Sequence, residues 1–381
     1  MVMQEEYIGE YSLKSLKQII EKANAKKILL LTGKKSYSTS DAKTKLEPFL
    51  RGLKVTRFSD FEVNPKIRDV YAGVGLALKK NPDLIIAIGG GTVIDMAKLI
   101  NILSSQTEHS FINIIKNSSL INNKGLSPLV AIPTTSGTGS EATHFAVVYV
   151  EKSKYSLAHK FMLPDYVIVD SSLSNKMPKN IAASAAIDAL SQAIESYWSV
   201  GSTTESQKFA RQSIEIILAS IEKAVIEKDA DAKDSMSLAA NLSGKAINIS
   251  KTTAAHAISY PISTYFNVPH GHAVGLLLGC FFEINSNFEL YGINDSRGSS
   301  YLTNTMLQLL KLFGAADPLD CKLAWYKMMN DIGLETNISK LGICSSDDID
   351  LISNNVNIER LNNNPVVVSE ETLKNILKSL F

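Results

Sequence analysis

The sequence is poor in cysteine and has no excess of charge of one sign. Its three cysteines, Cys280, Cys321 and Cys344, show no paired spacing, so we expect no disulfide framework and a reducing, cytoplasmic location. The polar start (residues 1–11) lacks the apolar core of a signal peptide, and no run of about 18 apolar residues marks a membrane span. Lysine and arginine total 39 against 38 acidic residues, so we expect neither nucleic acid nor a membrane as partner.

The 381 residues are enough for two ordinary domains. Residues 1–172 alternate apolar runs with helical patterns, which predicts a doubly wound α/β domain with a mainly parallel sheet. Its strands are expected at 28–32, 84–88, 129–133 and 166–170, and its helices at 12–23, 41–50, 67–80 and 92–103. Residues 173–381 lack strand patterns and predict an all-α domain. Its helices are expected at 181–198, 205–227, 231–249, 273–285, 301–312, 322–332 and 369–381.

A glycine-rich turn follows the second of these strands and opens a helix. Without side chains, Gly89, Gly90 and Gly91 allow the backbone to approach a pyrophosphate, and the helix start at Thr92 offers unpaired N–H groups. Asp95 follows in the first turns of that helix. The pattern is neither the Gly-x-Gly-x-x-Gly fingerprint nor a P-loop, and by itself it is equally compatible with a structural turn.

A second loop, rich in hydroxyl groups, follows the next strand. Thr134, Thr135, Ser136 and Thr138 are interleaved with glycines at the expected carboxyl edge of the sheet, where ribose and phosphate contacts are made. Two such loops on neighbouring strands together predict a nucleotide site.

The second half of the chain contains a candidate metal site. Asp188 and Gln192 lie four residues apart in an alanine-rich helix and therefore share a face. A carboxylate buried there is unfavourable unless it is paired or bound to a cation. With His256 and His270 it forms a ligand set typical of catalytic Fe²⁺ or Zn²⁺. The alternative is a hydrogen-bonded aspartate and two core histidines.

At this point the chain resembles the iron-containing (group III) alcohol dehydrogenases. The stretches that carry the resemblance are 64–65, 89–98, 133–141, 163–170, 188–195, 256–271 and 364–365. The resemblance implies NAD(P)-dependent oxidation of an alcohol or reduction of an aldehyde at one divalent metal, and it allows a homodimer. It places Asp188, His256 and His270 at three of the family's four metal positions and Gln192 at the fourth, normally a histidine. An amide oxygen binds more weakly, so Zn²⁺, Mn²⁺ or Ni²⁺ become alternatives to Fe²⁺.

The resemblance also suggests a catalytic position and a subfamily. Tyr260 stands where many members have a histidine near the nicotinamide, so a proton relay through that position uses a phenol, a water or nothing. Several stretches look closest to phosphonoacetaldehyde reductases, which form 2-hydroxyethylphosphonate. A phosphonate needs cationic or donor groups around it. The candidates are Lys251, Lys154, His159 and His272.

The loop after the first expected strand bears on the choice of cofactor. Members of the family that prefer NAD carry an acidic residue there, which holds the ribose hydroxyls. Here Gly33, Lys34 and Ser36 lie in a stretch without a carboxylate. Small and basic residues tolerate a 2′-phosphate, so we expect NADPH rather than NADH.

Three other interpretations compete with this one. The first is a dehydroquinate-synthase-like cyclase, which also uses nicotinamide and metal. The second is a glycerol- or butanol-type dehydrogenase acting on an uncharged substrate. The third is a non-catalytic nucleotide sensor whose metal site has decayed at Gln192.

Overall fold

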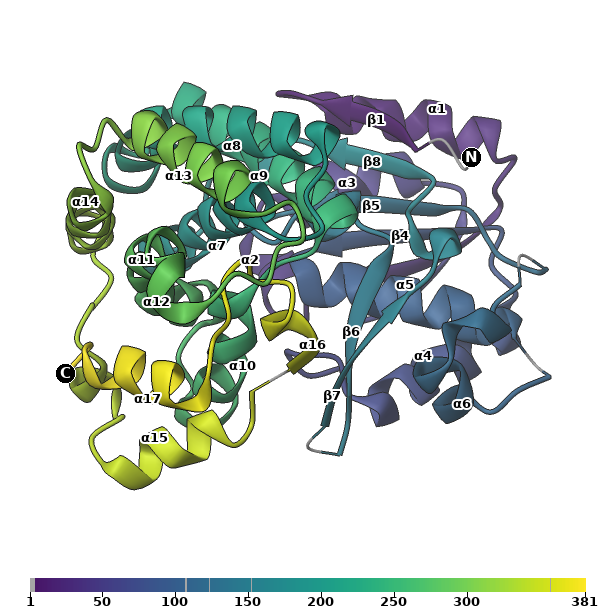
Figure 1. Ribbon diagram of the computed structural model, residues 1–381. Coiled ribbons are helices and arrows are strands. Elements are labelled where there is room, and N and C mark those ends of the chain that lie inside the picture. The colour runs from purple at the N-terminus through teal and green to yellow at the C-terminus, as the bar shows by residue number, and fades with distance from the viewer. Residues whose placement is uncertain (1–3, 107, 123, 152, 357) are drawn as a thin grey trace. The chain divides into compact units, whose positions relative to one another are not determined.

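The computed structural model describes residues 4–106, 108–122, 124–151, 153–356 and 358–381 (Figure 1). The chain divides into two compact units, Met1–Met177 and Pro178–Phe381. A short 3-10 turn, η6 (Ser171–Leu173), follows the last strand of the sheet, close to this division and to the domain boundary expected after residue 172, which stays a prediction. No helix in the described ranges is long and apolar enough to cross a membrane.

The first unit is built on a six-stranded parallel sheet with the order β1-β8-β5-β4-β2-β3. Figure 1 labels the neighbouring strands β1, β8, β5 and β4 of this sheet. The two central strands are almost wholly buried because both of their faces are covered, which explains their almost unbroken apolar sequence. The sheet confirms the predicted α/β class. Its strands are β1 (Glu5–Ile8), β2 (Lys27–Thr32), β3 (Lys54–Phe58), β4 (Leu84–Gly89), β5 (Leu129–Pro133) and β8 (Tyr166–Val169).

Helices of the first unit pack on the sheet through two apolar clusters, one of which includes Leu29 and Ile94 and the other Leu30 and Leu16. Leu29 and Leu30 are consecutive residues of β2 and point to opposite faces, so the unit has the three layers of a doubly wound fold. Its helices are α1 (Ser15–Lys22), α2 (Ser36–Thr39), α3 (Ala42–Leu46), α4 (Ile67–Lys80), α5 (Gly91–Ser105) and α6 (Phe111–Lys116).

Four strands of this unit were not expected from the sequence. Two are the sheet edges β1 and β3, which are partly exposed and therefore lack a continuous apolar run. The other two, β6 (Phe145–Val150) and β7 (Ser153–Ala158), form a separate antiparallel hairpin. The residues of β6 are all apolar, whereas β7 mixes polar and apolar residues without regular alternation, so the pair lacks the period-two pattern that indicates a half-buried hairpin.

The second unit is helical, as predicted. Its long elements are α7 (Lys179–Trp198), α8 (Thr204–Glu222), α9 (Ala230–Ser250), α10 (Ala254–Phe266), α11 (His270–Ser286), α13 (Ser299–Phe313) and α14 (Pro318–Asp331). Shorter ones are α12 (Phe288–Tyr291), α15 (Ser346–Ser353), α16 (Ile358–Leu361) and α17 (Glu370–Lys378). From Ala183 to its end at Trp198, α7 is buried at every residue except Ala185, because α8, α9 and α11 surround it.

Helix α10 was not expected, because Pro261 lies inside it and proline removes a helical hydrogen bond. The helix tolerates this residue at the cost of one backbone bond and packs against α11. Its first turn carries His256, and α11 begins at His270.

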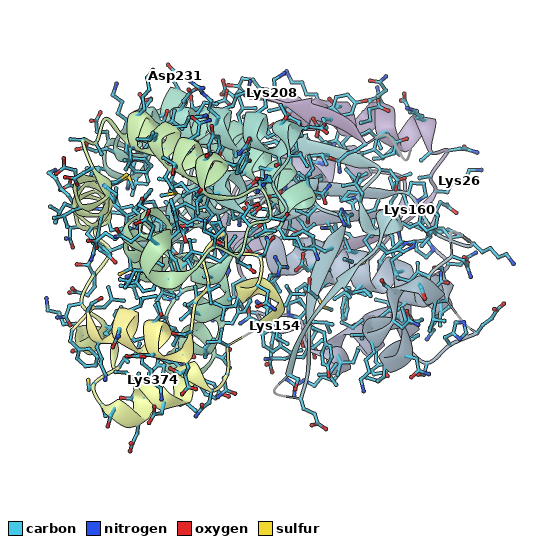
Figure 2. All side chains as sticks on the ribbon, in the orientation of Figure 1. Lys26, Lys154, Lys160, Lys208, Asp231 and Lys374 are labelled. Atoms are coloured by element: carbon cyan, nitrogen blue, oxygen red, sulfur yellow. The ribbon has the colours of Figure 1, made fainter. Side chains whose placement is uncertain are left out.

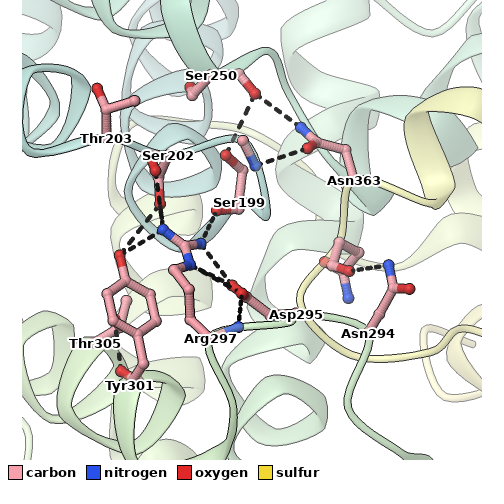
Figure 3. Close-up of polar contacts among 12 residues, drawn as sticks. Ser199, Ser202, Thr203, Ser250, Asn294, Asp295, Arg297, Tyr301, Thr305 and Asn363 are labelled. Atoms are coloured by element: carbon pink, nitrogen blue, oxygen red, sulfur yellow. Dashed lines mark hydrogen bonds and ion pairs between the residues drawn. The ribbon is translucent and has the colours of Figure 1, made fainter.

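A polar network holds the segments that follow α7 and α9 (Figure 3). Arg297 forms an ion pair with the buried Asp295 at 2.5 Å and donates to the carbonyl oxygens of Ser199 and Ser202 at 2.7 and 2.9 Å. The Nδ2 atom of Asn363 donates to the carbonyl oxygen of Ser250 at 2.9 Å. These bonds fix the loops at the carboxyl ends of two helices of the second unit that adjoin the site described next.

Candidate functional site

Helix α7 brings three polar side chains into the interior of the second unit. Asp188, Gln192 and Glu195 are spaced by four and three residues and therefore share one face of the helix. Their exposed fractions are 3%, 4% and 0%. Buried carboxylates require partners or a cation, so this face has a function other than packing.

Two histidines complete the cluster from the first turns of α10 and α11. One nitrogen each from His256 and His270 and one oxygen from Asp188 all lie within 4.8 Å of one another. The Nε2 atom of His256 is 3.3 Å from Asp188 Oδ1, and the two imidazole rings are 5.4 Å apart, centroid to centroid. The structure thus brings together three residues that lie far apart in the sequence.

Glu195 holds His256 from the opposite side. Its Oε2 atom is hydrogen-bonded to His256 Nδ1. Its Oε1 atom accepts from the backbone N–H groups of Thr253 and His256, both at 3.2 Å, and from the Thr253 hydroxyl at 2.9 Å. The carboxylate therefore also caps the first turn of α10, which its own N-cap residue leaves uncapped. Sequence reasoning missed this residue, although the argument made for a buried Asp188 applies equally to it.

The charges of the cluster favour bound protons or a cation. Burial by itself lowers the pKa of His256, but Glu195 and Asp188 outweigh burial and raise that pKa to about 9. Burial by itself raises the pKa of Asp188, but the hydrogen bond from His256 and the charge of His270 bring it below its ordinary value. Two carboxylates around one imidazole leave excess negative charge, and a metal ion would displace the proton from His256.

Gln192 lies between Asp188 and a neighbouring helix. Its Oε1 atom accepts from the hydroxyl of Ser243 on α9 at 3.2 Å, and its side chain is also hydrogen-bonded to Asp188. In this arrangement the amide of Gln192 orients the Asp188 carboxylate, while the amide oxygen accepts a hydrogen bond from Ser243. The predicted ligand role of Gln192 stays a prediction.

Tyr260 lies one turn after His256, beside the other histidine. Its ring stacks on that of His270, with the centroids 5.7 Å apart and the planes at 12°. The side chain is hydrogen-bonded to Thr252, and burial raises the pKa of the phenol above its ordinary value. Tyr260 is therefore a neutral phenol in contact with the metal-ligand cluster.

The four residues expected to bind the substrate are distributed over both units. In the second unit, Lys251 ends α9 with φ 63° and ψ 175°, and His272 is buried, with its Nε2 atom 2.6 Å from the carbonyl oxygen of Glu335. The latter contact gives His272 a structural partner, and its substrate role stays a prediction. In the first unit, Lys154 lies on the β6–β7 hairpin (Figure 2). His159 accepts from the backbone N–H of Phe161 at 3.3 Å.

The two loops expected to bind phosphate pack against each other at the carboxyl ends of β4 and β5. A Cβ atom built at Gly90 would lie 3.5 Å from Thr135 Oγ1, and one at Gly91 would lie 2.9 Å from Thr138 Oγ1. The backbone N–H of Thr134 donates to the carbonyl oxygen of Gly89 at 3.0 Å. Helix α5 starts at Gly91, so its positive end faces this junction.

The carboxylate of Asp95 accepts hydrogen bonds from other residues of the first unit. It accepts from the Ser140 hydroxyl at 2.6 Å and from the backbone N–H of Val147 at 3.0 Å. The buried Lys98, one turn later, donates to the carbonyl oxygens of Ser140 and Phe145 at 2.6 and 2.9 Å. Both residues hold the second loop in place. A direct contact of Asp95 with cofactor stays a prediction, as do the roles of Thr92 and Ser136.

The loop after β2 lies at the point where the strand order reverses, because β3 and β4 pair with opposite sides of β2. Nucleotides bind at such switch points. Lys34 forms an exposed ion pair with Asp60 at 2.7 Å, and Arg57 donates to the carbonyl oxygen of Gly33 at 3.2 Å. A Cβ atom at Gly33 would lie 2.0 Å from Ser36 Oγ, so these two residues are close neighbours in the turn.

Comparisons with known proteins agree along nearly the whole chain. Residues 4–171 match the family model of iron-containing alcohol dehydrogenase, and residues 182–381 match that of the C-terminal part of the Fe-containing alcohol dehydrogenase family. An NADPH-dependent butanol dehydrogenase of Clostridium saccharobutylicum is 32% identical over 74% of this chain and 73% of its own length. An NAD-dependent methanol dehydrogenase of Bacillus methanolicus is 27% identical over 98% of this chain and 97% of its own length.

A solved structure is similar over nearly its full length. It is sulfoacetaldehyde reductase from Bifidobacterium kashiwanohense in complex with NAD+, with a TM-score of 0.86, 27% identity and coverage of 99% of this chain and 96% of that one. The chain belongs to the iron-containing alcohol dehydrogenase family and is an NAD(P)-dependent alcohol dehydrogenase or aldehyde reductase.

Proposed function

We propose that the protein reduces phosphonoacetaldehyde, or another small aldehyde that carries an anionic group, to the corresponding alcohol. The reaction uses NAD(P)H and one divalent metal. The observation that carries the proposal is the convergence of Asp188, His256 and His270 within 4.8 Å. In this proposal residues 1–172 bind the cofactor and residues 173–381 hold the metal. A homodimer in the cytoplasm remains the expected form.

The donor set fits a divalent cation. Metal–ligand bonds of about 2.0–2.2 Å place the donors of a tetrahedral site about 3.5 Å apart, and the three donors lie within 4.8 Å of one another. One carboxylate and two imidazoles suit Fe²⁺ and Zn²⁺ and leave a coordination position for substrate. Glu195 supports the fit, because its bond to Nδ1 directs the Nε2 atom of His256 towards Asp188.

The residues of the chain have separate tasks in the reaction. When bound, the cation polarises the carbonyl and the reduced nicotinamide supplies the hydride. Asp188, His256 and His270 hold the cation, and Glu195 keeps His256 in the tautomer that has a lone pair on Nε2. Tyr260, stacked on His270, is a neutral phenol because burial raises its pKa, and the proton that completes the alcohol comes from water, directly or through this phenol.

The anionic substrate is supported by a cationic side chain in the second unit and by one relative. Lys251 lies five residues before His256 in the sequence. The related sulfoacetaldehyde reductase is named for an aldehyde with a sulfonate group, which like a phosphonate is a tetrahedral oxyanion.

An assay of cofactor oxidation tests the proposal. Stripped protein is loaded with Fe²⁺, Zn²⁺, Mn²⁺ or Ni²⁺ and supplied with phosphonoacetaldehyde or with uncharged aldehydes of similar length. We expect turnover of phosphonoacetaldehyde that disappears in His256→Ala and His270→Ala. Normal turnover and metal content in both variants would refute the role of the metal centre.

An uncharged substrate is the second candidate. It is favoured by the 32% identity to the NADPH-dependent butanol dehydrogenase. Turnover of butanal without turnover of phosphonoacetaldehyde would select it.

Two other outcomes would indicate other functions. Release of phosphate without net cofactor turnover would indicate cyclase chemistry, and cofactor binding without metal binding would indicate a sensor.

We also propose NADPH as the preferred cofactor. The turn Gly33–Ser36 has two lysines and no carboxylate, and Arg57 adds a third cation beside it. Asp60 offsets part of the charge of Lys34, so Lys35 is the residue most available to a 2′-phosphate. Comparison of kcat/KM for NADPH and NADH decides the preference.

A further inference from the structure

Thr252 links the metal-ligand cluster to Arg360, a positively charged residue that the sequence analysis did not identify. Its hydroxyl accepts from Nη1 of Arg360 at 2.9 Å, and its side chain is hydrogen-bonded to Tyr260. The Tyr260 ring in turn stacks on His270. Arg360 is thus connected to a metal-ligand candidate through two side chains, Thr252 and Tyr260.

The segment that carries Thr252 is held firmly on its other side. Nδ2 of Asn363 donates to the carbonyl oxygens of Ser250 and Thr252, both at 2.9 Å, and the backbone N–H of Asn363 donates to the carbonyl oxygen of Arg360 at 3.2 Å. Figure 3 shows Asn363 reaching the carbonyl oxygen of Ser250. The turn that carries Arg360 and the segment 250–252 therefore form one hydrogen-bonded unit.

Lys251, between Ser250 and Thr252, has an unusual backbone. Its φ of 63° and ψ of 175° lie in a region that only glycine normally occupies and that is unfavourable for other residues. Such strain persists only where the surrounding structure imposes it, and it is common at ligand sites. Here it places a lysine directly beside the residue that binds Arg360.

We propose that Arg360, with Lys251, binds the tetrahedral oxyanion group of a short aldehyde whose carbonyl end lies at the Asp188–His256–His270 cluster. The guanidinium is planar and always charged, and its donors match pairs of phosphonate or sulfonate oxygens. The bond to Thr252 fixes its orientation before the substrate arrives, which reduces the entropy lost on binding. This inference rests on the proposed aldehyde reduction and adds the residue that selects the substrate class.

The test compares Arg360→Gln and Arg360→Lys with wild type. The matched control is Arg211→Gln, which removes an exposed arginine of α8 that is paired with Glu215 on the same helix face. Substrates are phosphonoacetaldehyde, sulfoacetaldehyde and butanal. We expect Arg360→Gln to lower kcat/KM for an oxyanion aldehyde by about 10- to 100-fold, the loss of one charge-assisted contact, mainly through KM. The kcat/KM of Arg360→Gln for butanal changes less than about threefold, because that substrate has no anionic group.

Arg360→Lys keeps the charge and therefore loses less kcat/KM for oxyanion aldehydes than Arg360→Gln does, whereas Arg211→Gln behaves as wild type. A preference of the wild type for phosphonoacetaldehyde or for sulfoacetaldehyde identifies which oxyanion the site accepts. Equal losses for charged and uncharged aldehydes in both Arg360 variants, or no loss in either, would overturn the inference.

A binding measurement separates this inference from the proposed function. Ethylphosphonate and ethanesulfonate have no carbonyl group, and calorimetry measures their binding to metal-free protein. Binding that is lost in Arg360→Gln and kept in Arg211→Gln supports the oxyanion subsite even if no aldehyde is reduced. If neither compound binds wild type, the subsite is absent, whatever the outcome of the turnover assay.

Discussion

Glu195 and His256 are joined through the ring nitrogen that faces away from Asp188. The same carboxylate accepts the backbone N–H groups of Thr253 and His256 and the hydroxyl of Thr253 on its other oxygen. One buried side chain thus fixes both the start of α10 and the orientation of a metal-ligand candidate. Carboxylates in this position raise the basicity of the ligand, and their loss typically weakens metal binding about 10- to 100-fold.

Glu195→Gln should weaken metal binding while leaving the fold intact. The amide oxygen can still accept the three donors, which directs the NH₂ group towards Nδ1 of His256. The proton of the imidazole then moves to Nε2, where it blocks the metal. We expect a loss of metal affinity of about 10- to 100-fold, measured by chelator competition. Glu283→Gln, which removes a carboxylate paired with Lys322 in the same unit, is the control and should bind as wild type does.

Gln192→His should strengthen metal binding. An imidazole is a better ligand than an amide for Fe²⁺ and Zn²⁺, and position 192 faces the same side of α7 as Asp188, so we expect affinity to rise by about tenfold or more in the same competition assay. Gln192→Met, of similar size but without the amide, removes the hydrogen bond to Asp188 and should lower affinity. An unchanged affinity in both variants would place residue 192 outside the influence of the metal.

Lys35→Glu should shift the cofactor preference towards NADH. A carboxylate in the turn after β2 repels a 2′-phosphate and can accept a bond from the 2′-hydroxyl, so we expect the ratio of kcat/KM for NADPH to that for NADH to fall by about 10- to 100-fold. Lys17→Glu, an equal change of charge on the exposed face of α1, is the control. A similar fall in that variant would show that only net charge matters.

Lys98 should make the free energy of unfolding rise with pH in the alkaline range. Burial lowers the pKa of Lys98 from 10.5 to about 8, against the opposing effect of Asp95 and Glu141. Between these two values the unfolded chain binds more protons than the folded one, so stability increases with pH, by at most about 1.4 kcal/mol per pH unit. Well below the folded-state pKa this contribution is constant.

Urea unfolding of wild type and Lys98→Met at several pH values measures this effect. The difference in free energy of unfolding, wild type minus variant, should grow from about pH 8 to the ordinary lysine pKa of 10.5. The substitution also removes the donors to Ser140 and Phe145, which shifts the curve of the variant down at every pH. Lys17→Met controls for the loss of an exposed lysine. A difference that does not change with pH would contradict the lowered pKa.

Much of the fold and part of the site follow from local sequence. The apolar runs of β2, β4, β5 and β8 identify a buried parallel sheet because both faces of such strands are covered. The edge strands β1 and β3 give no such signal, since they are partly exposed. Helix α10 was hidden by Pro261, whose unfavourable effect on a helix is offset here by tertiary packing against α11.

The sequence by itself determined the kinds of groups present: a glycine-rich turn before a helix, a hydroxyl-rich loop, and one aspartate and two histidines with the chemistry of a metal site. Only the tertiary structure decided which of them meet. Asp188, His256 and His270 converge because α7, α10 and α11 pack together, and the same packing adds Glu195. Side chains separated by tens of residues approach each other only through the packing of whole helices, which no local pattern specifies.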